Sequence, residues 1–312
     1  MVSLSSRRPR ATARWSGRSL GGRWGHRFFY YGLRLFGLGF VYLFLYLVVP
    51  YFVLFASGPR RASYDYARRR LGLSRGRARC FVFGHFREFG VAMLDRWALR
   101  TRYAGRFSFE YAGDYSAVQE HLSTGRGMVM VGAHFGNPEV GFTQLGDGTA
   151  RQVYVTRYEG DRPTMQRELA RSRVVGAQQQ LSLGAESYAS MLRAHELLAQ
   201  GAIVCIQGDR YLPGTTTGRT SFLGASASFP TGVFRLAALE HLPLTAYYAV
   251  RTRALHYRFE FHFLPYPSGL PMGQVSQRYM ESYARWLERG VRAYPRQWFN
   301  YYDFWGSDGA EG

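Results

Sequence analysis

Residues 127–139 read Gly-Met-Val-Met-Val-Gly-Ala-His-Phe-Gly-Asn-Pro-Glu. Within this stretch, Met128 to Val131 is an uncharged run of β-branched and long apolar residues that begins and ends next to glycine. Such a run predicts a short buried strand, because surface strands alternate polar and apolar residues. His134 is therefore expected at the end of a central strand.

A strand-turn-helix corner is predicted directly after His134. Gly136 permits a turn, Asn137 is a preferred helix N-cap, and Pro138 suits the first position of a helix. Glu139 would then lie in the first turn of that helix. On one continuous helix, residues five apart point about 140° away from each other. Across such a corner, the two side chains can meet.

A carboxylate held against an imidazole is an arrangement suited to a general base. It orients the ring and stabilises the protonated form, so His134 could remove a proton near neutral pH with Glu139 as its partner. Amide groups at the start of the new helix could bind a developing oxyanion. The spacing is equally compatible with an ordinary strand-end histidine and an ordinary first-turn acid.

The stretch from His134 to Glu139 resembles the His-x-x-x-x-Asp/Glu signature of the lysophospholipid acyltransferase superfamily, and more narrowly the branch of the lipid A biosynthesis late acyltransferases. Three further segments agree in order along the chain: Gln207 to Arg210, Phe222 to Gly232, and Pro295 to Trp305. The resemblance implies transfer of a fatty acyl group from acyl carrier protein or coenzyme A to a hydroxyl of a lipid acceptor. It implies no cofactor and no acyl-enzyme, and N-acyl transfer stays open.

A basic substrate-binding residue is expected after the next strand. Val153 to Thr156 has a strand pattern that ends at Arg157, and open α/β sheets bind their ligands at strand ends. In the resembling family, a basic residue in this block holds the acceptor's phosphate or headgroup. This implies Arg157 as the first candidate and Arg162 as the second, with a solvated surface arginine as the alternative.

The apolar run Ala202 to Gln207 predicts another strand, which delivers Asp209 and Arg210 to the same edge of the sheet. Both are substrate-binding candidates by position and by resemblance, although a loop ion pair of little energetic weight is the alternative. Thr231 lies near the start of an apolar helix, in a block that borders the cleft in the resembling family. With Asn137, these residues complete the predicted substrate-binding set.

Two other groups of residues have a structural interpretation. His85 and Glu88 lie on a helix predicted from Phe81 to Leu99 and are interpreted as a helix-surface pair, with a role in the acceptor channel as the alternative. The aromatic cluster between Trp298 and Trp305 is expected to pack inside the protein or to face a membrane interface. The resembling family often has an acid where this chain has Arg296, which puts any family-typical contact there in doubt.

The formal net charge is +19, and every basic residue is an arginine. A charge this large predicts an anionic partner, such as lipid headgroups, an acidic carrier protein, a nucleotide-containing donor or nucleic acid. Arginine suits bidentate contact with phosphate. Cys80 and Cys205 are too few for a disulfide scaffold, and no histidine or cysteine spacing predicts a metal site.

Residues 35–59 lack any charge and are long enough to cross a bilayer, so we predict a retained membrane anchor there. Residues 1–34 form a basic segment, and 60–312 are predicted to be the acyltransferase domain. Eight arginines precede the anchor and eight follow within twenty residues, so the positive-inside rule gives no orientation. Equal numbers of arginines on the two sides are compatible with an oblique helix in the cytoplasmic leaflet, which places both basic flanks on anionic headgroups. The implied location is the cytoplasmic face of a bacterial inner membrane.

Alternating predicted strands and helices favour an α/β fold with a mostly parallel or mixed sheet flanked by helices. The absence of Gly-x-Ser-x-Gly weighs against a serine hydrolase, and no Asp-x-Asp pair supports a glycosyltransferase. A non-catalytic, membrane-tethered protein that binds anionic lipid or nucleic acid through its arginines is the alternative to the enzyme. Under the enzyme hypothesis, no nucleic acid is expected as a partner.

Overall fold

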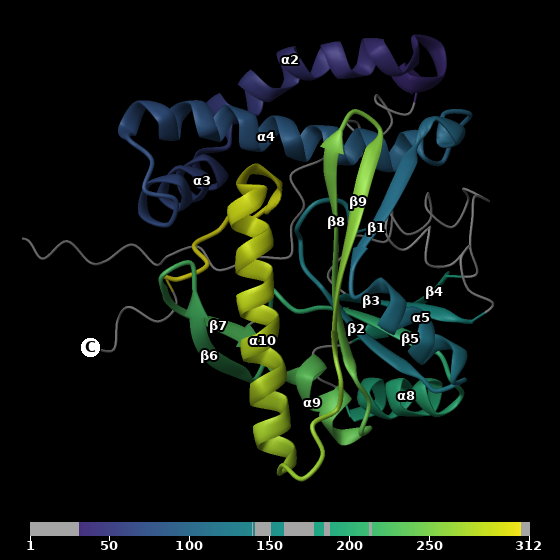
Figure 1. The fold of residues 1–312 in the computed structure, drawn as a ribbon. Coiled ribbons are helices and arrows are strands. Elements are labelled where there is room, and N and C mark those ends of the chain that lie inside the picture. Colours follow the sequence, from purple (N-terminus) through teal and green to yellow (C-terminus); the bar gives the residue numbers. More distant parts are fainter. Residues whose placement is uncertain are drawn as a thin grey trace, which may run out of the picture.

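A seven-stranded sheet forms the centre of the molecule (Figure 1). The structure is a computed structural model that describes residues 31–138, 140, 151–158, 178–183, 188–211 and 214–306. The strand order is β1-β9-β8-β2-β5-β3-β4, and all neighbouring pairs are parallel except β8 and β9. The strands are β1 (Ser108–Gly113), β2 (Met128–Gly132), β3 (Val153–Tyr158), β4 (Gln178–Leu183), β5 (Ile203–Gln207), β8 (Leu244–Arg253) and β9 (His256–Leu264).

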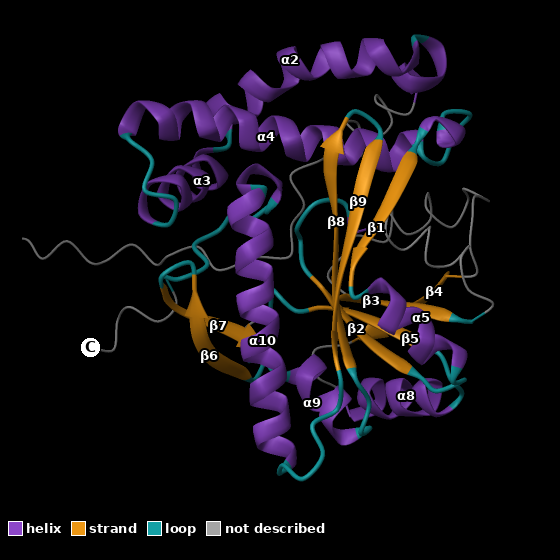
Figure 2. Cartoon of the chain, viewed as in Figure 1, coloured by secondary structure: helices purple, strands orange, loops and turns teal. Residues whose placement is uncertain are grey.

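Helices flank this sheet, and a separate two-stranded hairpin lies beside it (Figure 2). The helices are α2 (Gly37–Phe55), α3 (Ser57–Arg69), α4 (Arg75–Ala98), α5 (Tyr115–Ser123), α8 (Tyr188–Ala199), α9 (Gly232–Leu239) and α10 (Met272–Ala293), with short 3₁₀ turns at Ala104–Arg106 and Pro295–Gln297. The hairpin consists of β6 (Thr217–Phe222) and β7 (Ala225–Pro230). The predicted fold class, a mostly parallel sheet flanked by helices, is confirmed.

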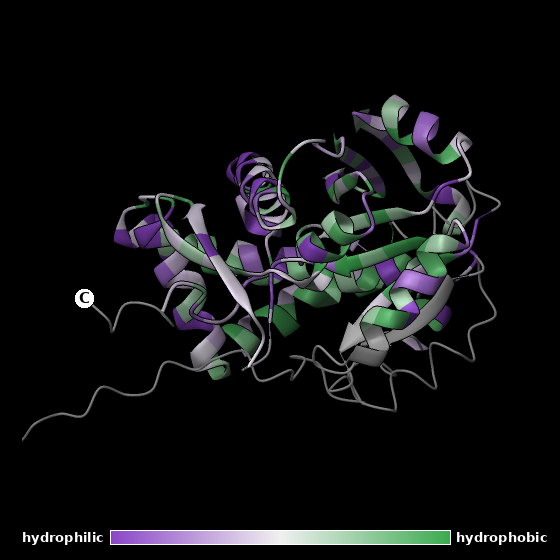
Figure 3. Cartoon of the chain, turned by 90° about the horizontal axis from the view of Figure 1, so that it is seen from below, coloured by the Kyte–Doolittle hydropathy of each residue, from purple (hydrophilic) through white to green (hydrophobic). Residues whose placement is uncertain are grey.

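Every residue of β2 is buried, which explains its uncharged sequence. Val129 and Val131 point to one face of the sheet and join the core formed with α8, α9 and α10. Met128 and Met130 point to the other face and join the core formed with α2 and part of α4. In Figure 3 the strands at the centre are mostly green, while the helices around them mix green and purple. The strand that carries His134 therefore lies between two apolar layers.

Helix α4 runs across the end of β8 toward which that strand's arrow points (Figure 1). Phe81 contributes to the core on one side of the sheet, whereas Val82, Val91 and Leu94 contribute to the core on the other. The helix begins at Arg75, before the predicted start, because the side chain of Ser74 caps it. The ion pair between Glu88 and Arg251 holds α4 at the carboxyl end of β8.

The sequence did not predict the β6-β7 hairpin or β4. Leu223 and Gly224 form the tight turn of the hairpin, both with positive φ (51° and 77°). Two-residue hairpin turns of this kind usually have the sequence Asn-Gly or Asp-Gly. With leucine at the first position, the sequence does not indicate a hairpin. Leu223 adopts this conformation because its side chain is buried and its N–H donates to Glu288 Oε2 at 2.7 Å.

Helix α2 lies within the predicted anchor 35–59 and contains Pro50. It is the one described helix that is long and apolar enough to cross a membrane by length and composition. Only 22% of its most apolar window is buried in the protein. A helix of this composition that is mostly unburied differs from an ordinary core helix, which would be covered on all sides.

Candidate active site

His134 and Asp209 meet at the carboxyl ends of two neighbouring strands. Strands β2 and β5 are parallel, and Gly132 lies beside Gln207 at the end of their shared register. The imidazole Nδ1 of His134 lies 2.8 Å from Asp209 Oδ1, and the backbone N–H of His134 donates to Asp209 Oδ2 at 2.9 Å. One carboxylate thus holds both the ring and the main chain of His134.

Asp209 is nearly inaccessible, with a side chain 2% exposed, whereas the His134 side chain is 33% exposed. Burial alone would raise the pKa of Asp209, but the contacts with His134 and the nearby charge of Arg210 outweigh it and lower that pKa below its ordinary value. Asp209 is therefore ionised at neutral pH. Because the carboxylate accepts the Nδ1 proton of neutral His134, the lone pair of the imidazole is at Nε2.

Glycines allow the two strand ends to approach this closely. The N–H of Gly208 donates to the carbonyl of Gly132 at 2.9 Å, so the parallel pairing continues one step past β5. A Cβ at Gly208 would lie 2.5 Å from Val131 Cγ2. The hydroxyl of Tyr283, on α10, also donates to the Gly132 carbonyl at 2.8 Å. The position of Asp209 therefore depends on the backbone of both strands and on α10.

The loop after His134 is clamped between β8 and the segment after α10. Phe299 N–H donates to His134 O at 2.9 Å, and Gly136 N–H donates to Gln297 O at 2.8 Å. Gly136 has a φ of +70°, and a Cβ there would lie 1.9 Å from the carbonyl oxygen of Ala249. Only glycine fits this corner, as the sequence predicted.

This clamp also decides where two amides of the turn point. Gly136 N–H is bonded to Gln297 O, and Asn137 N–H donates to Ala249 O at 2.7 Å. Pro138 has no N–H to offer. The predicted oxyanion site would therefore need donors other than Gly136 and Asn137.

Asn137 is buried, and its side chain points into the protein. The Nδ2 atom donates to Ala92 O on α4 at 2.9 Å and lies 3.5 Å from the hydroxyl of Tyr257 on β9. These contacts tie the loop to α4. The structure thus gives Asn137 a role in holding the loop, in addition to the predicted role in binding substrate.

The structure describes the remaining predicted site residues only in part. Glu139 and Arg162 lie outside the described residues. Arg157 is the fifth residue of β3, opposite Ser182 of β4, and its side chain also lies outside what the structure describes. Thr231 directly precedes α9, and its hydroxyl donates to Thr216 O at 3.1 Å beside the hairpin.

Arg210 connects Asp209 to the closing segment of the chain. The Arg210 guanidinium donates to Phe299 O and lies 5.7 Å from the centroid of the Tyr302 ring. The hydroxyl of Tyr302 donates to Asp209 O at 3.3 Å. Arg210 is thus engaged with residues 299–302, which the sequence analysis did not include in the site.

The closing segment was predicted to pack or to face a membrane interface, and packing is confirmed for Trp298, which is fully buried. The side-chain amide of Gln297 accepts from Arg251 N–H at 2.9 Å and donates to Arg251 O at 2.8 Å. A glutamine that satisfies both backbone groups of one residue holds the segment in register with β8. The signal for this role was the Pro-Arg-Gln-Trp motif, which resemblance identified without indicating its contacts.

The interpretation of His85 and Glu88 as a helix-surface pair is wrong. His85 is fully buried; its Nε2–H donates to Trp298 O at 2.9 Å, and its Nδ1 accepts from the Ser63 hydroxyl at 2.9 Å. Its ring stacks on Tyr301 at 4.5 Å. Burial lowers the pKa of His85 to about 3, so this histidine is neutral and structural.

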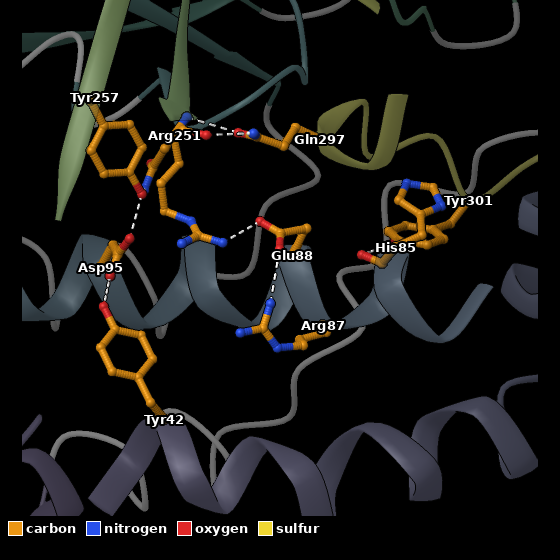
Figure 4. A network of polar contacts seen from close by, with 10 residues as sticks. Tyr42, His85, Arg87, Glu88, Asp95, Arg251, Tyr257, Gln297 and Tyr301 are labelled. Carbon is orange, nitrogen blue, oxygen red and sulfur yellow. Dashed lines mark hydrogen bonds and ion pairs between the residues drawn. The ribbon is translucent and has the colours of Figure 1, made fainter. Parts of the chain in front are cut away.

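Glu88 bridges two arginines instead of pairing with His85 (Figure 4). It accepts from Arg251 on β8 and from Arg87 on its own helix. Figure 4 also shows Asp95, further along α4, between the hydroxyls of Tyr42 and Tyr257. These contacts join α2, α4 and the sheet next to the loop that carries His134.

Within the described residues, no group of three or more His, Cys, Asp and Glu side chains could hold a metal ion. Cys205 is buried in β5, and Cys80 is exposed. The described site offers an imidazole oriented by a buried carboxylate.

Comparison with known protein families gives one match over most of the chain. Residues 85–305 match the family described as bacterial lipid A biosynthesis acyltransferase. A search of curated proteins found no match. The matched range contains His134, Asp209, Arg210 and the closing segment, which together form the candidate site.

Proposed function

The chain belongs to the bacterial lipid A biosynthesis acyltransferase family, and we propose that it is a membrane-bound enzyme that moves a fatty acyl group from an acyl thioester to a hydroxyl of a lipid acceptor. The contact between His134 and Asp209 carries this proposal. A buried, ionised carboxylate on Nδ1 of a partly exposed imidazole is the arrangement that supports a general base.

In the proposed reaction, Nε2 of His134 takes the proton of the acceptor hydroxyl as its oxygen attacks the thioester carbonyl carbon. The tetrahedral intermediate collapses, the carbon–sulfur bond breaks, and the thiolate leaves and recovers the proton from His134. Asp209 holds the ring in place and stabilises the imidazolium between these steps. The acyl group passes directly from donor to acceptor, so no acyl-enzyme forms.

Glu139 remains the second carboxylate in the proposal. Its place in the His-x-x-x-x-Glu motif supports a role beside His134, and Asp209 supplies the contact from the other strand. Arg157, at the end of β3, is proposed to hold an anionic group of the acceptor, since ligands of open α/β sheets bind at strand ends. Arg210, Asn137 and Thr231 are proposed to shape the substrate site.

The arginine excess supports an anionic donor and an anionic surface. Acyl carrier protein would offer acidic side chains, and coenzyme A would offer phosphates. The apolar helix α2 supports attachment to a membrane. We propose the cytoplasmic face of a bacterial inner membrane as the location, because both thioester donors are cytoplasmic.

The test is acyl transfer by the purified chain in detergent, with acyl carrier protein and coenzyme A thioesters supplied separately and lipid products identified by mass spectrometry. We expect His134→Ala to lower kcat by about 10²- to 10⁴-fold, the usual contribution of a general base. The matched control is His195→Ala, because His195 also contacts a carboxylate, that of Glu240 at 2.8 Å, but on the surface.

His195→Ala should leave activity unchanged. If His134→Ala transfers acyl groups as fast as the native chain, His134 is not the base and the mechanism is wrong. If no thioester donor acylates any hydroxylated lipid while binding to anionic vesicles remains salt-dependent, the non-catalytic alternative replaces the enzyme.

A further inference from the structure

Helix α2 leaves most of its large apolar side chains exposed. It contains no charged residue, and four of its residues are buried: Leu38, Val41, Leu45 and Val49. Its opposite side, which we call the outer face, consists of Leu35, Phe36, Phe40, Leu43, Leu47, Tyr51, Leu54 and Phe55 at α2 and the turn before it. An exposed apolar patch of this size marks an interaction surface.

The buried side of α2 lies along α4, with the two helices antiparallel. Tyr42 bonds to Asp95, Leu45 packs on Gly90, and the guanidinium of Arg87 lies 5.7 Å from the centroid of the Tyr46 ring. As the chain advances along α2, its partner on α4 moves back toward the start of that helix. The two antiparallel helices therefore lie alongside each other over this length, as Figures 1 and 4 show.

This packing argues against a helix that crosses a bilayer. Glu88 on α4 forms an ion pair with Arg251 on β8, and both side chains are less than one fifth exposed. If α2 stood across the membrane in this arrangement, α4 and its ion pairs would enter the hydrocarbon region beside it. Charged groups are costly there. A helix lying in the plane of the membrane avoids that cost, because α4 then faces the headgroups and the protein.

Arginines stand at both ends of α2. Arg60 Nη1 donates to the carbonyls of Val53 and Leu54 at 2.9 and 3.0 Å, so it caps the last turn of α2. Arg34 is exposed just before the helix begins. Further exposed arginines on α3 and at the start of α4 are Arg61, Arg69, Arg75, Arg77 and Arg79. Both ends are thus suited to anionic headgroups.

We propose that α2 lies in the plane of one leaflet of an anionic membrane, with its outer face among the acyl chains and both ends at the headgroups of the same side. This inference rests on the membrane-bound part of the proposed function and is independent of the chemistry at His134. Asn137 contacts α4 through Ala92 O, so the loop that carries His134 is held at a fixed height below the membrane surface. Lipid substrates then reach the site without leaving their leaflet.

Cysteine labelling tests the topology. In the full chain with Cys80→Ser, a single cysteine is placed before α2 by Arg34→Cys or after it by Ser57→Cys, and sealed inside-out or right-side-out vesicles are treated with a membrane-impermeant maleimide. Cys205 is buried and should not react. We expect both positions to react in the same vesicle orientation. Reaction in opposite orientations means that α2 spans the bilayer and overturns the proposal.

Vesicle flotation tests the outer face itself. The variant Leu43→Glu with Leu47→Glu should lower binding to phosphatidylglycerol vesicles at least about tenfold, because two large apolar contacts are replaced by charge. The matched control is Leu239→Glu, an exposed leucine on α9. It should bind as the native chain does, and both variants should retain the native melting temperature.

Equal binding of the double variant and the native chain would overturn the proposal, whatever the labelling shows. If the native chain does not float with anionic or with phosphatidylcholine vesicles, the membrane-bound part of the proposed function fails as well. Acyl transfer measured in detergent is unaffected by either result, so the chemistry at His134 is judged separately.

Discussion

Asp209 and Asp95 are both buried carboxylates, yet the protein shifts their pKa values in opposite directions. Asp209 lies at the end of β5 against His134, and its pKa is lowered. Asp95 lies on α4 between the hydroxyls of Tyr42 and Tyr257, and burial raises its pKa because these hydroxyls and Arg251 do not compensate fully. The partners of each acid, rather than burial, decide the direction in which its pKa moves.

The different partners suit Asp209 to chemistry and Asp95 to a structural link. Asp209 pairs with a ring that can become a cation, so its negative charge gains value as His134 takes up a proton. Asp95 joins two neutral hydroxyls from α2 and β9, which suits a link between elements. A buried acid is therefore a candidate for catalysis when its partner can become a cation by taking up a proton.

Replacing each acid by its amide tests whether Asp209 and Asp95 have different roles. We expect Asp209→Asn to lower kcat by about 10²- to 10⁴-fold, because a neutral amide cannot stabilise the imidazolium of His134. Asp95→Asn should keep most of the activity, since an amide can still bond to both tyrosine hydroxyls. The measurement is steady-state acyl transfer by both variants in the same detergent.

Circular dichroism and the melting temperature serve as the control, because a loss of fold would lower activity trivially. If Asp95→Asn is the more damaging of the two while both variants remain folded, the assignment of chemistry to Asp209 is wrong. Equal losses would mean that the two acids belong to one coupled unit.

A smaller effect is expected when the link between Asp95 and its two tyrosines is removed, and it should appear in the stability of the fold. Asp95→Ala leaves the hydroxyls of Tyr42 and Tyr257 buried without their acceptor, at a cost of about 1–3 kcal/mol for each. Tyr42→Phe removes a donor instead and should cost only about 1 kcal/mol. Thermal unfolding in detergent measures both. A melting temperature of Asp95→Ala equal to that of the native chain would show that this link does not stabilise α2 on α4.

Local sequence patterns predicted the elements of the site better than their contacts. The apolar runs before His134 and Asp209 were predicted as strands, and both strands end at the same edge. The contact between the two side chains requires β2 to lie beside β5, with Gly132 opposite Gln207. Strand order is a long-range property, so local patterns did not predict the contact between His134 and Asp209, and the pairing of His134 with Glu139 stays a prediction.

His85 shows the same limit from the other side. The helix that carries His85 was predicted, but the burial of its side chain was not. Its partners Ser63 and Trp298 lie 22 and 213 residues away in the chain. No pattern within α4 records that the closing segment covers this position. The turn between β6 and β7 was not predicted for a different reason: Leu223 adopts a positive φ, which leucine seldom takes.

The smallest expected effect, and the one that resolves the two acids most directly, is the pH dependence of stability. Because the folded pKa of Asp209 is lowered, its contribution is present above about pH 4, the pKa of an unfolded aspartate, and is lost as the pH falls through the folded pKa. The folded pKa of Asp95 is raised, so its contribution is present below about pH 4 and is lost as the pH rises through the folded pKa.

These opposite signs predict opposite slopes when each amide variant is compared with the native chain. The stability lost in Asp209→Asn should grow as the pH rises from the acid range to neutrality, whereas the stability lost in Asp95→Asn should shrink. Denaturant unfolding at a series of pH values measures both differences, and the shared contribution of neutral His85 cancels in each. Two slopes of the same sign would mean that the fold shifts the pKa values of Asp209 and Asp95 in the same direction, because the sign of each slope reports whether the folded pKa lies above or below the unfolded one.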